Sequence, residues 1–269
     1  MVSLGFHTTH YSPMFGGTSS AVDVIRASAS AGFTHVGLDL ASIEAHVASG
    51  GRVEELADVL NESRLSCSDI VGYFPTPDQG MRESAIYVSR IATLLGAPLV
   101  VISSSSTVAW SEVRQQCAEA SRIFASDGRR SAVEFIPHRD ISNLDMAIEL
   151  CDLAGWDRAG LVIDSFHFFM GHTSIERLQT LERDHIALVQ YSDARTLEPV
   201  DRADESRNQR VLPGDGCLPL PDFTKAILGL GYEGVVSAEV LSSVLRGREP
   251  FDVAITCHRT MMRDWPVAR

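Results

Sequence analysis

Short runs of apolar and β-branched residues alternate along this chain with longer segments whose apolar residues recur at helical spacing. The short runs, eight in number, are expected to be strands at residues 2–6, 35–40, 67–73, 98–103, 131–136, 160–165, 186–192 and 234–240. The segments between them predict helices at residues 19–32, 52–63, 81–97, 111–126, 143–155 and 222–231. Serines at the starts and glycines such as Gly32 at the ends suit helix caps.

This βα repeat predicts a single (β/α)8 barrel, with parallel strands inside and helices outside. The strands start roughly 30 residues apart, except that the last interval is longer and leaves an inserted loop at about residues 194–220. A doubly wound open sheet is the alternative, but it should carry a glycine-rich phosphate turn after its first strand, and HTTHYSPMFGG is not GxGxxG. Because no linker or shift in composition divides the chain, we expect residues 1–269 to form one domain.

Polar side chains interrupt four of the predicted strands near their carboxyl ends, where a barrel carries its chemistry. These residues are Glu134, Asp164, Gln190 and Glu239. A carboxylate buried ionised and unpaired costs several kcal/mol, so each needs compensation. An arginine could neutralise any one of them, but oxygen donors from four consecutive strands favour a hard divalent cation such as Mn²⁺ or Mg²⁺. We therefore predict one metal ion at the barrel mouth.

The same segments resemble the xylose-isomerase-like TIM-barrel superfamily, which contains sugar phosphate isomerases and epimerases. The resemblance spans nearly the whole chain and is strongest in AVEFIPH, LVIDSFHF, LVQYSDA, RVLPGDGCLPL and VVSAEVL. It implies that Glu134, Asp164, Gln190 and Glu239 hold one divalent metal ion. It also implies an isomerase or epimerase of a sugar, sugar phosphate or polyol ketone, which takes a proton from the carbon next to a carbonyl and passes through a metal-stabilised enediolate.

The resemblance further implies roles for individual side chains. Glu134 and Glu239 would serve as base and acid as well as ligands, and His167 would hydrogen-bond a substrate hydroxyl. Apart from the resemblance, the guanidinium of Arg210, in the long loop, suits a bidentate grip on a substrate hydroxyl, carboxylate or phosphate, and a surface arginine is the alternative. His7 and Trp110 are further predicted substrate contacts, and a core or packing role is the alternative for each.

Gln190 departs from the family pattern, because the epimerases more often have histidine at this position. Some members of the superfamily, including 3-dehydroshikimate dehydratases, resemble this chain in having glutamine there. This leaves a metal-dependent lyase or dehydratase open, acting on a shikimate-type acid, an inosose or a C-glycoside. Loss of water or of an aglycone would separate it from an isomerase, whose product has the mass of its substrate.

Charge and cysteine content narrow the remaining classes of function. The formal net charge of −12 disfavours nucleic acid as a partner, and with it a DNA-repair endonuclease on the same barrel. The odd number of cysteines, 5, without close pairs predicts a reducing cytoplasm. No signal peptide or membrane span is apparent. A non-catalytic partner subunit remains an alternative, and the resemblance implies homo-oligomers.

Overall fold

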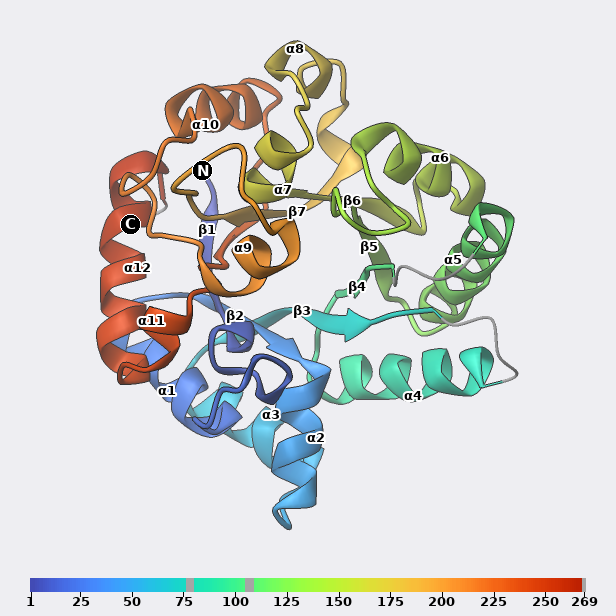
Figure 1. Ribbon diagram of the computed structural model, residues 1–269. Coiled ribbons are helices and arrows are strands. Elements are labelled where there is room, and N and C mark those ends of the chain that lie inside the picture. The colour runs from blue at the N-terminus through green and yellow to red at the C-terminus, as the bar shows by residue number, and fades with distance from the viewer. Residues whose placement is uncertain (76–79, 105–108, 268–269) are drawn as a thin grey trace.

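The computed structural model describes residues 1–75, 80–104 and 109–267, and within them the strands close into an all-parallel barrel. Each strand pairs with the next in sequence, and the last pairs with the first (Figure 1). The predicted (β/α)8 barrel is confirmed. The strands are β1 (Ser3–His7), β2 (His35–Asp39), β3 (Ser66–Tyr73), β4 (Leu99–Ile102), β5 (Arg130–Glu134), β6 (Ala159–Asp164), β7 (Ile186–Tyr191) and β8 (Val235–Ala238).

Most of the helices form an outer ring around the strands, whereas α9 (Arg202–Asn208) lies over the barrel opening (Figure 1). The helices are α1 (Ala21–Ala31), α2 (Leu40–Ala48), α3 (Val53–Glu62), α4 (Met81–Leu94), α5 (Trp110–Ser126), α6 (Leu144–Ala154), α7 (Ser165–Met170), α8 (Ile175–Leu178), α9, α10 (Leu220–Gly229), α11 (Ser243–Arg246) and α12 (Pro250–Asp264). Short 3-10 helices are η1 (Thr8–Tyr11), η2 (Pro13–Phe15) and η3 (Arg183–His185). No helix in the described ranges has the length and apolar character that a membrane span requires.

All six predicted helices are present, while the sequence analysis did not predict α2, α7, α8, α9, α11 and α12. Two of these have clear physical signals. Asp39 ends β2 and caps α2, because its carboxylate accepts a hydrogen bond from the Ser42 backbone amide at 3.0 Å. Pro250 opens α12, whose buried side chains Val253, Cys257 and Met261 recur at helical spacing.

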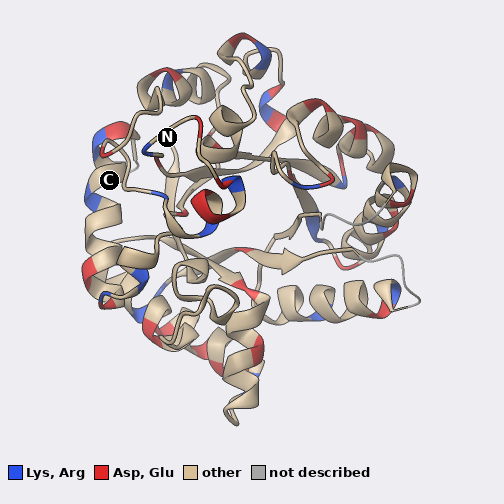
Figure 2. Cartoon of the chain, viewed as in Figure 1, with Lys and Arg blue, Asp and Glu red and all other residues tan. Residues whose placement is uncertain are grey.

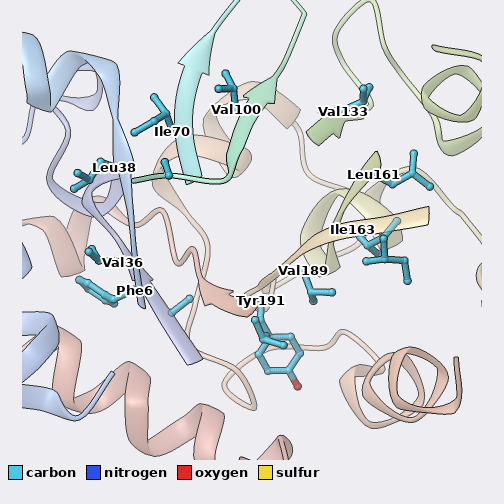
Figure 3. Close-up of a cluster of buried hydrophobic side chains, with 14 of the residues drawn as sticks. Phe6, Val36, Leu38, Ile70, Val100, Val133, Leu161, Ile163, Val189 and Tyr191 are labelled. Carbon is cyan, nitrogen blue, oxygen red and sulfur yellow. The ribbon is translucent and has the colours of Figure 1, made fainter. Parts of the chain in front are cut away.

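Successive side chains of each strand point to opposite faces of the sheet, and this alternation divides the core into two layers. One set of side chains points outward against the helices, as Figure 3 shows. Its labelled members are Phe6, Val36, Leu38, Ile70, Val100, Val133, Leu161, Ile163, Val189 and Tyr191. The other set fills the barrel interior with Val71, Val101, Ala132, Val162 and Leu188. A side chain two residues beyond Ala132, Val162 or Leu188 therefore faces the barrel axis at the carboxyl-terminal mouth.

Gly37 of β2 is required by a polar pair that fills the barrel beside it. His7 Nε2 lies 3.0 Å from Asp69 Oδ2, and both side chains are fully buried. A methyl group on Gly37 would run into the His7 ring and the Asp69 carboxylate. We expect Gly37→Ala to lower the free energy of unfolding by about 2–3 kcal/mol, the usual cost of overpacking. Urea denaturation measures this loss, and Gly229→Ala, whose added methyl has nothing within 4 Å, is the control that should lose no stability.

Candidate active site

Four polar side chains occupy the interior positions at the ends of neighbouring strands, as the alternation requires. Glu134, Asp164 and Gln190 each lie two residues beyond the apolar interior residues Ala132, Val162 and Leu188. Glu239 follows β8 directly, and its backbone amide continues the strand pairing to Tyr191. Backbone register pairs Asp164 with Gln190 and Gln190 with Ser237. The predicted donors therefore come from consecutive strands of one barrel mouth.

A cavity of about 470 Å³ opens above these strand ends. Its floor contains Glu134, Glu239 and His167 together with Arg210, and α9 contributes Ser206 and Arg207 to its side. In Figure 1, α9 lies in front of the barrel opening. Figure 2 shows that most charged residues are on the peripheral helices, whereas α9 brings acidic and basic residues to the middle of the view. The volume falls in the range of small-molecule sites.

The carboxylates of the floor surround the guanidinium of Arg210, which is only 1% exposed. Arg210 Nη1 donates to Asp164 Oδ2 at 2.8 Å and lies 3.5 Å from Glu239 Oε2. Its other donors are directed to the backbone carbonyl of Ser206 and to His167 Nε2, the latter at 3.1 Å. Arg210 is therefore a central buried cation of the site and not a surface residue.

One arginine does not balance three buried carboxylates. Burial, and then repulsion by Glu239, raises the pKa of Glu134 to about 8. Burial also raises the pKa of Glu239 to about 7, although Arg210 opposes the shift. Asp164 likewise has a raised pKa because of burial, with Arg210 acting in the opposite direction. The pKa of the Arg210 guanidinium is raised because its carboxylate neighbours outweigh the effect of burial. The floor therefore opposes full ionisation of its carboxylates, and further positive charge would favour their ionised forms.

The donor set fits a divalent cation. Ligand atoms of Glu134, Asp164 and His167 lie within 4.8 Å of one another. His167 Nε2 is 3.7 Å from Asp164 Oδ2 and 4.0 Å from Glu134 Oε1, and burial keeps the pKa of its imidazole well below the ordinary value, so the ring is neutral. Both amide atoms of Gln190 are buried without a hydrogen-bond partner. Unsatisfied buried groups of this kind suit a ligand that the protein alone does not supply.

Two predicted substrate contacts lie away from the cavity. His7 is fully buried below it, with Nε2 on Asp69 and Nδ1 accepting the Thr9 backbone amide, so neither ring nitrogen is free for a substrate. Trp110 begins α5 and packs against the outer apolar layer, and it does not line the cavity. The structure therefore gives both side chains packing or positioning surroundings, the alternative that the sequence analysis left open for each. Strand and helix patterns do not reveal which residues extend over the mouth.

The sequence analysis also missed functional neighbours. Ser103 follows β4 and donates to Glu134 Oε2, which leaves Oε1 facing the cavity side shared with His167. Asp69 pairs with His7, and its signal was a charged residue in the apolar run 67–73. Arg139 lines the cavity from a loop. Nothing in the periodicity of the chain marks Ser103 or Arg139.

Comparison with known proteins places this geometry in context. The chain is similar to the inosose isomerase of Halalkalibacterium halodurans, with 29% identity over 171 residues that cover 61% of this chain and 58% of that relative. It is also similar to the 3-dehydroshikimate dehydratase of Pseudomonas aeruginosa, with 31% identity over 108 residues, 40% of this chain and 17% of that protein. This chain thus spans less than two-thirds of the length of either relative.

Among solved structures, the IolI protein with a bound zinc atom superposes with a TM-score of 0.85 at 18% identity, and the alignment covers 97% of each chain. At this identity the likeness describes the fold. A family model described as the xylose isomerase-like TIM barrel matches residues 25–257. This match covers most of the chain, and the chain accordingly belongs to the xylose isomerase-like TIM barrel family.

Proposed function

We propose that this protein is a divalent-metal-dependent isomerase or epimerase of a sugar, sugar phosphate or cyclic polyol ketone. The observation that carries the proposal is the floor of the cavity, where three buried carboxylates from β5, β6 and the end of β8 share one arginine. Two of them, Glu134 and Glu239, line the cavity and have pKa values near neutrality. Similarity to an inosose isomerase supports the same class of reaction.

The proposed ligands are Glu134, Asp164, Gln190 and Glu239, and His167 lies in the same cluster as a neighbouring group. A divalent ion bound there supplies a Lewis acid that polarises a carbonyl and stabilises negative charge on oxygen. The predominance of oxygen donors favours Mn²⁺ or Mg²⁺. The zinc atom named for the IolI structure makes Zn²⁺ the ion to compare with them.

The chain's own groups would divide the proton transfers. Glu134, oriented by Ser103, takes the proton from the carbon next to the carbonyl, and Glu239 returns a proton from a position three strands away. A carboxyl group with a pKa near neutrality can both accept and release a proton. His167 accepts from Arg210 at Nε2, so its proton is assigned to Nδ1, which is buried without a partner and can donate to a substrate hydroxyl. Arg210 holds Asp164 in place.

A dehydratase or other lyase is the second candidate, favoured by Gln190 and by the similarity to a 3-dehydroshikimate dehydratase. Removal of the same proton would be followed by loss of a leaving group from the next carbon. Mass spectrometry of the product decides between the two, because an isomerase conserves the mass of its substrate and a dehydratase releases water.

The proposal is tested by metal removal and by proton exchange in heavy water. Chelation should lower the melting temperature, and one divalent ion per chain should restore it, since a ligand at a hundred times its Kd stabilises by about 2.7 kcal/mol. Inososes, ketoses and 3-dehydroshikimate are then screened by NMR for metal-dependent exchange of a carbon-bound proton. Neither metal binding nor exchange with any of these compounds would leave the proposal without support and favour a non-catalytic barrel.

A further inference from the structure

Two arginines at the rim of the cavity have no anionic partner. Arg139 lies in the loop after β5, and Arg207 lies in the last turn of α9. Both line the cavity and both are half-buried. Within residues 1–75, 80–104 and 109–267, neither guanidinium forms a hydrogen bond or ion pair, whereas surface arginines such as Arg82, Arg114 and Arg177 have carboxylate partners.

The acidic residues nearest to this pair do not neutralise it. Asp140 follows Arg139 in the chain, but it lines a separate small cavity together with Gln116 and Cys117. Asp201 caps the start of α9, where its carboxylate accepts the backbone amides of Ala203 and Asp204. Within the described ranges neither carboxylate forms an ion pair with Arg139 or Arg207, although the charges of Glu134 and Asp140 act on Arg139 from a longer distance.

The two guanidinium groups are close enough to affect each other. Burial, and then Arg207, lowers the pKa of Arg139. Burial, followed by Arg139 and Arg207, lowers the pKa of the neighbouring His138 to about 4, so this imidazole is neutral and adds no charge of its own. Like charges brought together in a partly dry site cost free energy unless an anion joins them.

The position of Arg207 is fixed by the packing of α9 against α11. Arg246 donates from Nη2 to the backbone carbonyl of Arg207 at 2.9 Å and from Nη1 to Asn208 Oδ1 at 3.0 Å. Ser243 Oγ donates to the carbonyl of Asn208 at 3.2 Å. The helix end is therefore held over the cavity, which limits how far the Arg207 side chain can move away from Arg139.

The cavity is consequently divided by charge. Its floor is acidic, its rim is basic, and apolar side chains of Phe15, Val71 and Leu241 line the wall between. We propose that the substrate is anionic, a hydroxy-ketone that carries a carboxylate or phosphate bound by Arg139 and Arg207 while its reacting carbons lie at the carboxylate floor. Attraction of the anionic group to the rim would set the orientation of the substrate. This inference rests on the proposed function, because it takes this cavity as the active site.

Paired probes that differ in charge test the proposal on the metal-loaded full chain. Calorimetry compares shikimate with its methyl ester, and myo-inositol 1-phosphate with myo-inositol. We expect at least one anionic member to bind about tenfold or more tightly than its neutral partner, the effect of a charge-assisted hydrogen bond. Tighter binding of shikimate than of its methyl ester identifies a carboxylate site. Tighter binding of myo-inositol 1-phosphate than of myo-inositol identifies a phosphate site. Equal binding within both pairs overturns the inference.

Variants test whether Arg139 and Arg207 cause the tighter binding of the anionic probes. The double variant Arg139→Gln and Arg207→Gln should lose the tenfold preference. Arg122→Gln should keep it, because it removes an exposed charge on α5 that forms no ion pair within the described residues. A preference that survives in the double variant contradicts the assignment. The proposed function is tested separately by metal content and proton exchange: a protein that binds the metal and exchanges a carbon-bound proton, but shows no preference for the anionic probes, would refute only the anion site.

Discussion

Glutamine in place of Glu134 is expected to reduce substrate proton exchange by at least about a hundredfold, and up to about 10⁴-fold, while the barrel stays folded. The amide has the shape of the carboxyl group and can still accept the hydrogen bond from Ser103. It cannot take up a proton from carbon, and it is a neutral ligand. Deuterium incorporation followed by NMR measures the loss.

The matched control is Glu62→Gln, which changes an exposed glutamate on α3 far from the cavity floor and should exchange at the wild-type rate. Metal content of each variant shows whether the loss follows from a missing ligand or a missing base. Glu239→Gln should behave like Glu134→Gln, because both carboxylates line the cavity. Wild-type exchange in either variant would remove that residue from the mechanism.

Glu134→Gln is also expected to stabilise the metal-free protein near neutral pH. The pKa of Glu134 is raised from 4.5 to about 8 in the fold, so the folded state holds a proton that the unfolded state has released. This group's contribution to stability is present below pH 4.5 and is lost as the pH rises toward 8. Glu134→Gln should remove that loss, with a gain on the order of 1–3 kcal/mol at pH 8. Thermal unfolding of chelated protein between pH 5 and about 8 measures it.

Function therefore opposes stability at the barrel mouth. The carboxylates whose charges repel are the ones that would bind a cation and move protons, and Arg210 relieves only part of the repulsion. Strain of this kind is common where a site is arranged for a ligand that arrives after folding. An unchanged pH profile in the metal-free variant would contradict this account of the floor.

The sequence predicts those parts of the site that lie on strands. Alternation with a period of two fixes which side chains face the barrel axis, so Glu134, Asp164 and Gln190 could be assigned to one mouth from their spacing alone. Closure of the barrel then makes consecutive strands neighbours. These two rules require no knowledge of the loops.

The remaining parts depend on loop conformation, for which the sequence has no periodic signal. Arg210 is remote from Asp164 in sequence, and only the path of the loop after β7 brings its guanidinium to 2.8 Å from that carboxylate. Arg139 and Arg207 line the same cavity for the same reason. Conversely, His7 ends its strand as predicted, but Asp69 from β3 binds its ring below the cavity. Pairings of this kind arise from tertiary contacts that strand patterns do not specify.

Asp193 organises the loop that contains Arg210, and its loss is expected to be the most destabilising single change at the mouth. One carboxylate oxygen accepts the backbone amides of Ala194 at 2.8 Å and Leu218 at 3.0 Å. The other accepts those of Gly214 at 3.0 Å and Gly216 at 3.1 Å. Four backbone donors on one side chain tie the start and the end of residues 194–218 together.

Asp193→Ala should therefore lower the free energy of unfolding by at least about 3 kcal/mol, because hydrogen bonds to a charged acceptor contribute about 1.5–3 kcal/mol each and water can replace only the exposed ones. Asp193→Asn keeps one acceptor oxygen and should lose less. Asp215→Ala, in the same loop but with an exposed carboxylate, is the control and should stay within about 0.5 kcal/mol of wild type. Urea denaturation measures all three variants.

Protease sensitivity distinguishes loss of the loop from loss of the whole fold. With the loop released, Arg210 would no longer be held against Asp164, so cleavage within residues 194–218 should appear together with weaker metal binding while the barrel remains cooperative in its unfolding. An Asp193→Ala protein with wild-type stability and metal affinity would show that the loop is held by other contacts, such as the strand-like bridge between residue 193 and Val211. That result would separate the placement of Arg210 from the carboxylate of Asp193.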